Sequence, residues 1–383
     1  MTNKQFLLST HGTFHYFDLA NELNSRSMLN RIVSGYPKFK LKKYKLPFSK
    51  IHSTGMYQII TQTLSRYQFS NKKILDYLNL LNAKQIDRIS SSYINTSDIF
   101  LSLSGTGLNS GKQFIESKKM YICERASAHV EFCNDIYKEE YDKFNYSYYS
   151  SSEFIERELE EYEQSSFILL PSRFSQQTFA DKGLFKTKVI DYPASDEHFY
   201  PIPKLQNSLD QFNILYVGGL TIRKGLEYLI DAFNKIKFKN KRLHLVGTKA
   251  FDFKFIQNKI NNENTKIYGH LNQFKINEMM NKSQLMVLPS LQDGSGIVIS
   301  QALKTGLPVI VTENTGIEKL VKEFQCGYVV PIRDSNILHD RIDYLIENQQ
   351  QLKIFSNNAK KFAQNHTWKN YVDQLIEIID QFS

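Results

Sequence analysis

The stretch Pro289-Ser-Leu-Gln-Asp-Gly-Ser-Gly-Ile-Val-Ile-Ser-Gln-Ala-Leu303 decides the fold expected for this chain. Apolar residues predict a strand over 285–288 and another over 308–312, and Gly306 is placed to end a helix between them. The order is therefore strand, glycine-rich loop and helix. Gly294 and Gly296 allow a ligand to approach the backbone closely, and the first N–H groups of the helix have no partner inside it. This arrangement is typical of an anion site.

Asp293 stands at the mouth of this loop, where its negative charge does not suit the anion itself. Its carboxylate is better placed to accept hydrogen bonds from hydroxyl groups beside the anion. A phosphate and a polyol in one crevice indicate a nucleotide-sugar.

The length of 383 residues is comfortable for two domains. No apolar run approaches membrane-spanning length, and no signal peptide is recognisable. Cys123, Cys133 and Cys326 are scattered, odd in number and without metal-ligand spacing, which favours a reducing cytoplasm and predicts no metal site. The net charge of +9 suits phosphates, an acidic membrane surface or nucleic acid, although a bias toward Lys and Asn would also explain it. Nucleic-acid binding rests on charge alone and is not expected.

Two series of alternating strands and helices lie on either side of a polar segment over 193–212 that contains Pro193, Pro201 and Pro203. We therefore predict an α/β protein with two facing, doubly wound parallel-sheet domains. The N-terminal domain is expected over residues 1–195, joined by a C-terminal helix over 367–383, and the second domain over 196–366.

The second half of the chain resembles the retaining, nucleotide-sugar-dependent glycosyltransferases of family 4, which have the GT-B fold of two Rossmann-like domains. The motifs that carry the resemblance occur in the family's order: Val217-Gly218, Arg223-Lys224-Gly225, Leu245-Val246-Gly247, Tyr268-Gly269-His270, Leu288-Pro289-Ser290, Asp293 to Ala302, Pro308-Val309-Ile310 and Gly327-Tyr328-Val329-Val330. The N-terminal half shares fewer features with the family, namely 124–129, 172–174 and Phe199.

The resemblance implies roles for individual residues. Arg223 and Lys224 would neutralise the diphosphate leaving group, although an adjacent Arg and Lys can also be a solvated turn. His129 would hydrogen-bond a hydroxyl of the transferred sugar, and with Asp293 it completes the catalytic set. The predicted donor-binding residues are Gly218, Gly219, Arg223, Lys224, Gly269, His270, Gly294, Ser295, Gly296, Ile297, Val298 and Gln301. The acceptor is expected near Gly12, Thr13, Arg125 and Ser127, and near the loop over 105–111.

The family's signature has two Glu residues where this chain has Asp293 and Gln301, and many relatives carry Arg in place of Gly219. The resemblance still implies transfer of a hexose-type sugar from a nucleoside diphosphate to a glycan or glycolipid acceptor, typical of cell-envelope polysaccharide synthesis, without a metal or other cofactor. The alternatives are a degenerate nucleotide-binding module without turnover, or another GT-B enzyme such as an epimerase or phosphorylase.

Two charged segments have more than one interpretation. In 38–50, Lys residues alternate with Phe39, Leu41, Tyr44, Leu46 and Phe48, which fits peripheral contact with an anionic membrane at the inner face of the plasma membrane. A solvated surface strand or hairpin explains the same pattern. The acidic segment 153–163 is predicted to be a solvated helix face, not a metal site.

Overall fold

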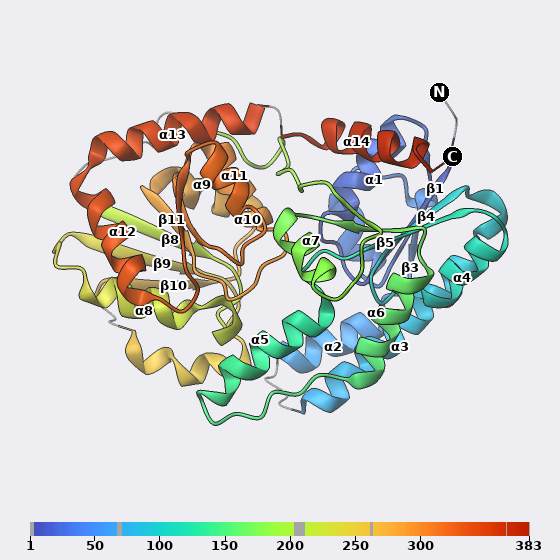
Figure 1. The fold of residues 1–383 in the computed structure, drawn as a ribbon, viewed down its shortest axis with the longest axis horizontal. Helices are drawn as coiled ribbons and strands as arrows, with labels where there is room; N and C mark the ends of the chain where they lie inside the picture. Colours follow the sequence, from blue (N-terminus) through green and yellow to red (C-terminus); the bar gives the residue numbers. More distant parts are fainter. Residues whose placement is uncertain (1–3, 67–70, 203–210, 261–262, 365, 383) are drawn as a thin grey trace.

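The computed structural model describes residues 4–66, 71–202, 211–260, 263–364 and 366–382. Two parallel β-sheets lie side by side, each flanked by helices (Figure 1). The predicted pair of facing Rossmann-like domains is confirmed.

The N-terminal sheet has seven strands in the order β3-β2-β1-β4-β5-β6-β7, with all neighbouring pairs parallel. The strands are β1 (Phe6–Thr10), β2 (Leu29–Ser34), β3 (Ile51–Ser53), β4 (Ile99–Leu103), β5 (Met120–Glu124), β6 (Phe167–Leu170) and β7 (Thr187–Val189). Its helices are α1 (Tyr16–Ser25), α2 (Met56–Arg66), α3 (Lys72–Ser91), α4 (Leu108–Glu116), α5 (Val130–Asp142), α6 (Ser152–Gln164) and α7 (Arg173–Ala180). Short 3-10 helices are η1 (Lys38–Lys43), η2 (Phe48–Lys50) and η3 (Ile94–Thr96).

The C-terminal sheet has six parallel strands in the order β10-β9-β8-β11-β12-β13. They are β8 (Phe212–Val217), β9 (Lys241–Val246), β10 (Thr265–Gly269), β11 (Leu285–Leu288), β12 (Val309–Thr312) and β13 (Gly327–Val330). The helices are α8 (Leu226–Lys235), α9 (Gln273–Lys282), α10 (Ile297–Thr305), α11 (Glu318–Glu323), α12 (Ser335–Glu347) and α13 (Gln349–Gln364), with the 3-10 helices η5 (Ile222–Lys224), η6 (Phe251–Phe255) and η7 (Gln257–Lys259). Gly306 adopts φ +81 directly after α10 and ends that helix as expected.

Both faces of the N-terminal sheet are covered by hydrophobic cores. Successive side chains of a strand point to opposite faces, so Phe6 and Leu8 of β1 join one core while Leu7 joins the other. The first core also contains α14 (Trp368–Asp380), whose Tyr371, Leu375 and Ile379 are buried. The last helix of the chain therefore packs beside α1 of the N-terminal domain (Figure 1). The domain boundary predicted at residues 195 and 196 falls between β7 and β8 and stays a prediction.

Three local expectations were wrong. Residues 38–50 form η1 and η2 instead of a surface strand, because Leu41 and Leu46 turn inward and are buried. The loop expected over 105–111 is shorter, because α4 already begins at Leu108. The expectation for 153–163 was wrong in part: Glu153, Glu156, Glu160 and Glu163 are exposed, whereas Glu158 and Glu161 are buried against distant partners.

Candidate functional site

The order of each sheet reverses at one place, between β1 and β4 and between β8 and β11. In doubly wound sheets, ligands bind outside the carboxyl ends of the strands at such a switch point. In the C-terminal domain, the loops at this point are 218–225 after β8 and 289–296 after β11. They contain the candidate residues Arg223, Lys224 and Asp293.

The two loops are in direct contact. Gly225 adopts φ +65, and a side chain there would collide with the Pro289 carbonyl. The Leu291 N–H donates to the Arg223 carbonyl at 3.3 Å. This close packing brings the Lys224 Nζ within 2.6 Å of Asp293 Oδ2.

Lys224 and Asp293 form a mostly buried ion pair, with side chains 15% and 17% exposed. Asp293 Oδ1 also accepts from the Gly296 N–H at 3.2 Å. Burial alone would raise the pKa of Asp293, but the charge and hydrogen bond of Lys224 and the Gly296 amide outweigh it and hold that pKa below its usual value. Burial and the charge of Arg223 lower the pKa of Lys224, although Asp293 opposes them. The pair therefore places a carboxylate and an ammonium group at the start of α10.

Gly296 directly precedes α10 and adopts φ +56, a conformation that favours glycine. The first N–H groups of α10, from Ile297 and Val298, lie beside the Lys224–Asp293 pair in the sequence-predicted anion site. A helix start next to a Lys suits a phosphate.

Glycines, which have no side chain, stand at the carboxyl ends of the neighbouring strands β8, β9 and β10, namely Gly218, Gly247 and Gly269. The Gly218 N–H donates to the Val246 carbonyl, and the Gly247 N–H donates to the Gly269 carbonyl, each at 2.9 Å. A side chain at Gly247 would collide with the Gly218 carbonyl. His270 follows β10 and is exposed. The other predicted donor residues lie in the same loops or in the first turns of α10, and they are Gly219, Ser295, Ile297, Val298 and Gln301.

Arg223 differs from Lys224 in its surroundings. Its side chain is exposed, and its guanidinium carbon lies 6.0 Å from the centroid of the Tyr137 ring on α5. The N-terminal domain therefore lies close to the phosphate side of the candidate site.

Gln292, directly before Asp293, links the two domains. Its carboxamide lies 2.7 Å from Ser127 Oγ and 2.6 Å from Tyr137 Oη. With the carboxamide oxygen toward Ser127, Gln292 also accepts from the N–H groups of Ala128 and Gly294 at 3.1 Å, and its nitrogen donates to Tyr137. Sequence analysis did not single out Gln292, although it is a polar residue within the loop that decides the fold.

Asp252 makes a second link. Its Oδ2 accepts from Tyr141 Oη at 2.5 Å, from Thr221 Oγ1 at 2.6 Å and from the Ile222 N–H at 3.1 Å. Tyr141 belongs to α5, whereas Thr221 and Ile222 begin the segment that carries Arg223 and Lys224. No local sequence signal marks Asp252, because its partners come from distant parts of the chain.

The loop over 125–129 approaches the C-terminal domain. A side chain at Gly294 would collide with the Ser127 backbone, and the Gly294 carbonyl accepts from Ser172 Oγ at 2.7 Å. The Arg125 guanidinium, expected on the acceptor side, is held by Glu158 at 2.7 Å. Ser127 contacts Gln292, as described above.

His129 is almost completely buried at the start of α5. Its Nδ1 accepts from the Glu131 N–H at 3.3 Å, and burial lowers its pKa to about 4. The ring is therefore neutral near pH 7 and carries its proton on Nε2. Among the described residues, Nε2 has no hydrogen-bond partner. It is nevertheless buried, because the ring packs against Tyr162 at 5.5 Å and Phe179 at 4.8 Å between centroids.

On the N-terminal side, Gly12 and Thr13 follow β1 at the other switch point. Gly12 is buried and its carbonyl accepts from Ser34 Oγ at 2.9 Å, while Thr13 is half-buried.

The expected acceptor loop after β4 is instead occupied by internal carboxylates. Glu161 accepts from the Gly105 N–H at 2.6 Å and from the Gly107 N–H at 2.9 Å. Asp87 accepts from the Ser110 N–H at 2.8 Å at the start of α4. Burial raises the pKa of Glu161 to about 8, although Arg157 and the two amides oppose this. The N–H groups of this loop therefore have partners within the protein.

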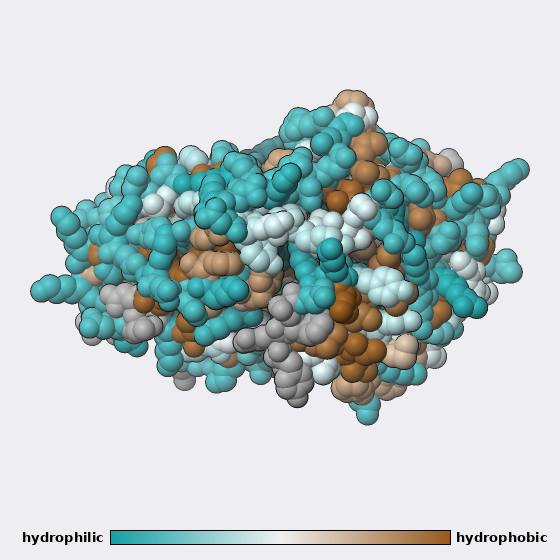
Figure 2. All heavy atoms as spheres, turned by 90° about the horizontal axis from the view of Figure 1, so that it is seen from below, coloured by the Kyte–Doolittle hydropathy of each residue, from teal (hydrophilic) through white to brown (hydrophobic). Residues whose placement is uncertain are grey.

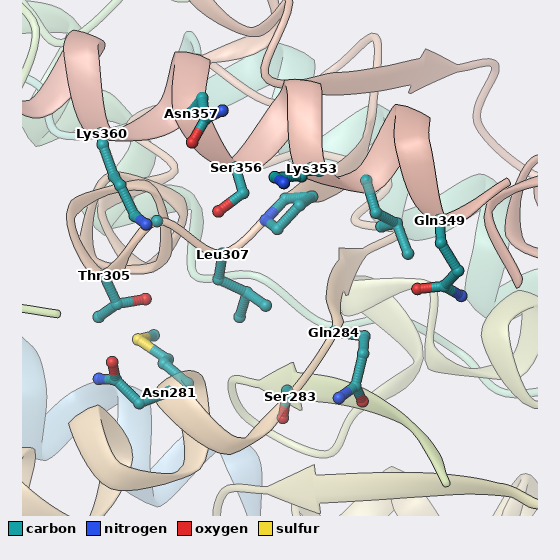
Figure 3. Close-up of a pocket in the computed structure, with 14 residues that line it drawn as sticks. Asn281, Ser283, Gln284, Thr305, Leu307, Gln349, Lys353, Ser356, Asn357 and Lys360 are labelled. Carbon is teal, nitrogen blue, oxygen red and sulfur yellow. The ribbon is translucent and has the colours of Figure 1, made fainter. Parts of the chain in front are cut away.

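Two hollows in the described structure lie apart from the predicted donor residues. A cavity of about 400 Å³ lies at the amino ends of β11 and β12, between α9 and α13, with Lys353, Ser356 and Lys360 among its lining residues (Figure 3). A groove of about 520 Å³ lies between α5, α7 and the 314 and 332–333 segments. In the described parts of the chain, no cluster of three or more His, Cys, Asp or Glu side chains could hold a metal ion. None of the described helices is both long and apolar enough to cross a membrane.

Comparison with known proteins connects this geometry to one superfamily. Residues 202–362 match the family described as glycosyl transferases group 1. An uncharacterised glycosyltransferase of Methanocaldococcus jannaschii is 28% identical over 172 residues, which are 44% of this chain and 48% of the relative. The capsular polysaccharide biosynthesis glycosyltransferase CapM of Staphylococcus aureus is 27% identical, over 41% of this chain and 42% of CapM. The second half of the chain is therefore similar to group 1 glycosyltransferases, and the chain spans only about half the length of the first curated relatives.

Solved structures are similar over nearly the whole chain. Sucrose-phosphate synthase from Thermosynechococcus elongatus has a TM-score of 0.76 at 15% identity and covers 99% of both chains. Anabaena HepE in complex with UDP-glucose has a TM-score of 0.72 at 17% identity, over 99% of this chain and all of HepE. At these identities the likeness concerns the fold, and the predicted GT-B fold is confirmed.

Proposed function

We propose that this protein is a retaining glycosyltransferase of family 4 that transfers a hexose-type sugar from a nucleoside diphosphate to a glycan or glycolipid. The observation that carries the proposal is the Lys224–Asp293 pair beside the start of α10, at the switch point of the C-terminal sheet. One site thus combines a cation and N–H donors for a diphosphate with a carboxylate acceptor for sugar hydroxyls.

In the proposed reaction, the bond between the anomeric carbon and the diphosphate breaks first. Arg223, Lys224 and the first N–H groups of α10 stabilise the negative charge that develops on the leaving diphosphate. Asp293 accepts hydrogen bonds from sugar hydroxyls while the anomeric carbon gains positive charge. The acceptor hydroxyl then attacks from the same face and passes its proton to the diphosphate. These protein groups supply the positive charge that departure needs, so we propose a reaction without a metal or other cofactor.

The nucleoside is proposed to lie against the bare backbone at Gly218, Gly269 and His270. For His129 to donate from Nε2 to a hydroxyl of the transferred sugar, as the resemblance implies, its ring would have to leave its contacts with Tyr162 and Phe179. Gly12, Thr13, Arg125 and Ser127 are proposed to border the acceptor. A nucleotide-sugar donor is supported by the fold shared with HepE, which was solved with UDP-glucose. Polysaccharide synthesis as the setting is supported by the likeness to CapM.

The proposed location is the cytoplasm, at the inner face of the plasma membrane. Cys123, Cys133 and Cys326 are free and buried, as expected in a reducing compartment.

A panel of UDP-, GDP-, ADP- and dTDP-sugars tests the proposed function. Binding is measured by titration calorimetry, and transfer or slow hydrolysis is measured by release of the nucleoside diphosphate. Binding of a donor without release would favour the degenerate binding module, which the replacement of Glu by Gln301 supports. Absence of binding across the panel would refute both functions.

We predict that Arg223→Ala or Lys224→Ala weakens nucleoside diphosphate binding by about 1.5–3 kcal/mol, the value of a charge-assisted hydrogen bond. Calorimetry with UDP, GDP and ADP measures the change. The matched control is Lys319→Ala, which removes an exposed cation of α11 that pairs with Glu323. Unchanged affinity in both variants would show that the diphosphate binds elsewhere.

We also predict that Gln301→Glu alters donor affinity more than turnover. A carboxylate at this position would form charge-assisted hydrogen bonds to a ribose hydroxyl, which are about twice as strong as neutral ones. KM and kcat are compared with those of the parent and of Gln349→Glu, an exposed control on α13. A change in kcat with an unchanged KM would contradict the assignment of Gln301 to the ribose.

A further inference from the structure

Helix α2 presents an apolar stripe to solvent. Met56, Ile59 and Ile60 are 54%, 43% and 40% exposed. Their spacing of three and four residues puts them on one side of the helix, and Thr63 continues that side and is also exposed. A helix of a soluble domain normally turns such a stripe toward the core. Hydrophobic residues gather on this side of the N-terminal domain, in the right half of the view from below (Figure 2).

The 3-10 helices η1 and η2 adjoin α2. Lys40 Nζ donates to Gln62 Oε1 of α2 at 3.0 Å. A side chain at Gly55, directly before α2, would touch Pro37, directly before η1. Lys38 Nζ lies 5.4 Å from the centroid of the Phe48 ring, which joins η2 to the same surface. We call the exposed side chains of η1, η2 and α2 the η1–α2 face.

The η1–α2 face combines cations with exposed apolar side chains. Lys38, Lys40 and Lys42 are exposed, and Phe39 and Phe48 are 62% and 45% exposed. Leu41 is fully buried, so it anchors η1 while its neighbours point outward.

Charge is segregated around this face. Residues 23–75 contain Lys and Arg but no Asp or Glu, although the whole chain has 39 acidic residues. In the structure, Glu197 of the interdomain segment pairs with Lys45 at 2.9 Å. Lys38, Lys40 and Lys42 have no acidic residue near them in the sequence, so their field attracts anions.

We propose that the η1–α2 face docks on an anionic phospholipid bilayer. Met56, Ile59, Ile60 and the two Phe rings would enter the boundary between headgroups and acyl chains, while the lysines contact lipid phosphates. Nucleic acid fits less well: bases could stack on Phe39 and Phe48, but the aliphatic side chains of Met56, Ile59 and Ile60 offer no ring and would remain exposed to water. The docking deepens the proposed location at the inner face of the plasma membrane by naming the surface and the lipid class, and it does not depend on the proposed glycosyl transfer.

Co-sedimentation with vesicles tests the proposal. The full chain is mixed at low salt with vesicles of phosphatidylcholine alone or with 30% phosphatidylglycerol. We expect binding to the anionic vesicles, lost at 0.5 M salt. Each lysine near the surface contributes about five-fold to the partition coefficient, so the triple variant Lys38→Gln, Lys40→Gln, Lys42→Gln should bind about 100-fold more weakly. The double variant Ile59→Ser, Ile60→Ser should bind about ten-fold more weakly, because apolar area is lost.

The matched controls lie on the C-terminal domain, where Phe238 is 41% exposed between exposed lysines. Lys235→Gln, Lys237→Gln, Lys239→Gln repeats the charge change, and Phe238→Ser repeats the apolar change. Both controls should sediment like the parent. Equal binding by the η1–α2 variants and the parent, or binding of the parent to an RNA oligonucleotide but not to anionic vesicles, would overturn the proposal.

Discussion

Asp293→Asn is expected to lower turnover by about 10²–10³-fold, the scale for one preorganised electrostatic group. Asp293 would interact with sugar hydroxyls most strongly when the anomeric carbon gains positive charge, and an amide lacks the negative charge for this. Nucleoside diphosphate binding should stay the same or tighten. Lys224 Nζ lies 2.6 Å from Asp293 Oδ2, so the neutral variant releases the amine for the diphosphate. Steady-state kinetics with the donor found in the panel and calorimetry with the diphosphate measure the two effects separately.

The control for this substitution is Asp340→Asn on α12, where the side chain is 74% exposed. It should leave both quantities unchanged. If Asp293→Asn turned over donor at the parent rate, the catalytic assignment would be wrong. If it weakened diphosphate binding instead, Asp293 would serve to hold Lys224 in place.

Arg157→Met is expected to destabilise the N-terminal domain by about 3–5 kcal/mol, because it leaves the buried Asp87 carboxylate without its cation. Arg157 is 6% exposed and donates to Asp87 Oδ2 at 2.5 Å and to the Gly105 carbonyl at 2.8 Å. Glu161 Oε1 lies 3.7 Å from its Nε. Methionine fills a similar volume, so the loss of stability would reflect the missing charge and hydrogen bonds of Arg157.

Unfolding of this domain can be followed in urea through fluorescence, because Trp368 is the only tryptophan and packs in the N-terminal core. The control Arg88→Met removes an exposed cation of α3 and should change stability by less than about 0.5 kcal/mol. Adding Asp87→Asn to Arg157→Met should recover part of the loss, since one buried charge is then removed. If the Arg157→Met protein were as stable as the parent, water would have to hydrate the Asp87 carboxylate in place of the guanidinium.

The network around Arg157 occupies the loop over 105–111, which was expected to contribute to the acceptor side. Its carboxylates hold the N–H groups after β4, so the start of α4 is fixed by the protein itself and cannot serve as an open anion site. The part of the proposed acceptor region that stays open comprises the loops after β1 and β5, with Gly12, Thr13 and Ser127. Arg125 pairs with Glu158. It would therefore affect acceptor binding only by holding the 125–129 loop in position.

The sequence by itself determined the two doubly wound domains and the place of the candidate donor site. Strands of parallel sheets are continuous apolar runs, which the sequence shows directly. The glycines at 294, 296 and 306 mark a loop and a helix end, because the backbone conformation required there depends only on a few neighbouring residues. Such local signals sufficed to predict the strand, loop and helix around Asp293. The pairing of Lys224 with Asp293 follows from topology, because parallel strands bring their carboxyl ends to one edge.

Only the tertiary structure decided which charged side chains face water. Glu158 and Glu161 look like a solvated acidic helix in the sequence, but partners such as the Gly105 amide, 56 residues away, bury them. The same holds for Gln292 and Asp252, whose contacts with Tyr137 and Tyr141 join the domains across more than a hundred residues. It holds also for 38–50, where burial of Leu41 and Leu46 overrode an alternating pattern. A buried polar group is stable only when distant groups satisfy its hydrogen bonds, and no local pattern records where those groups will be.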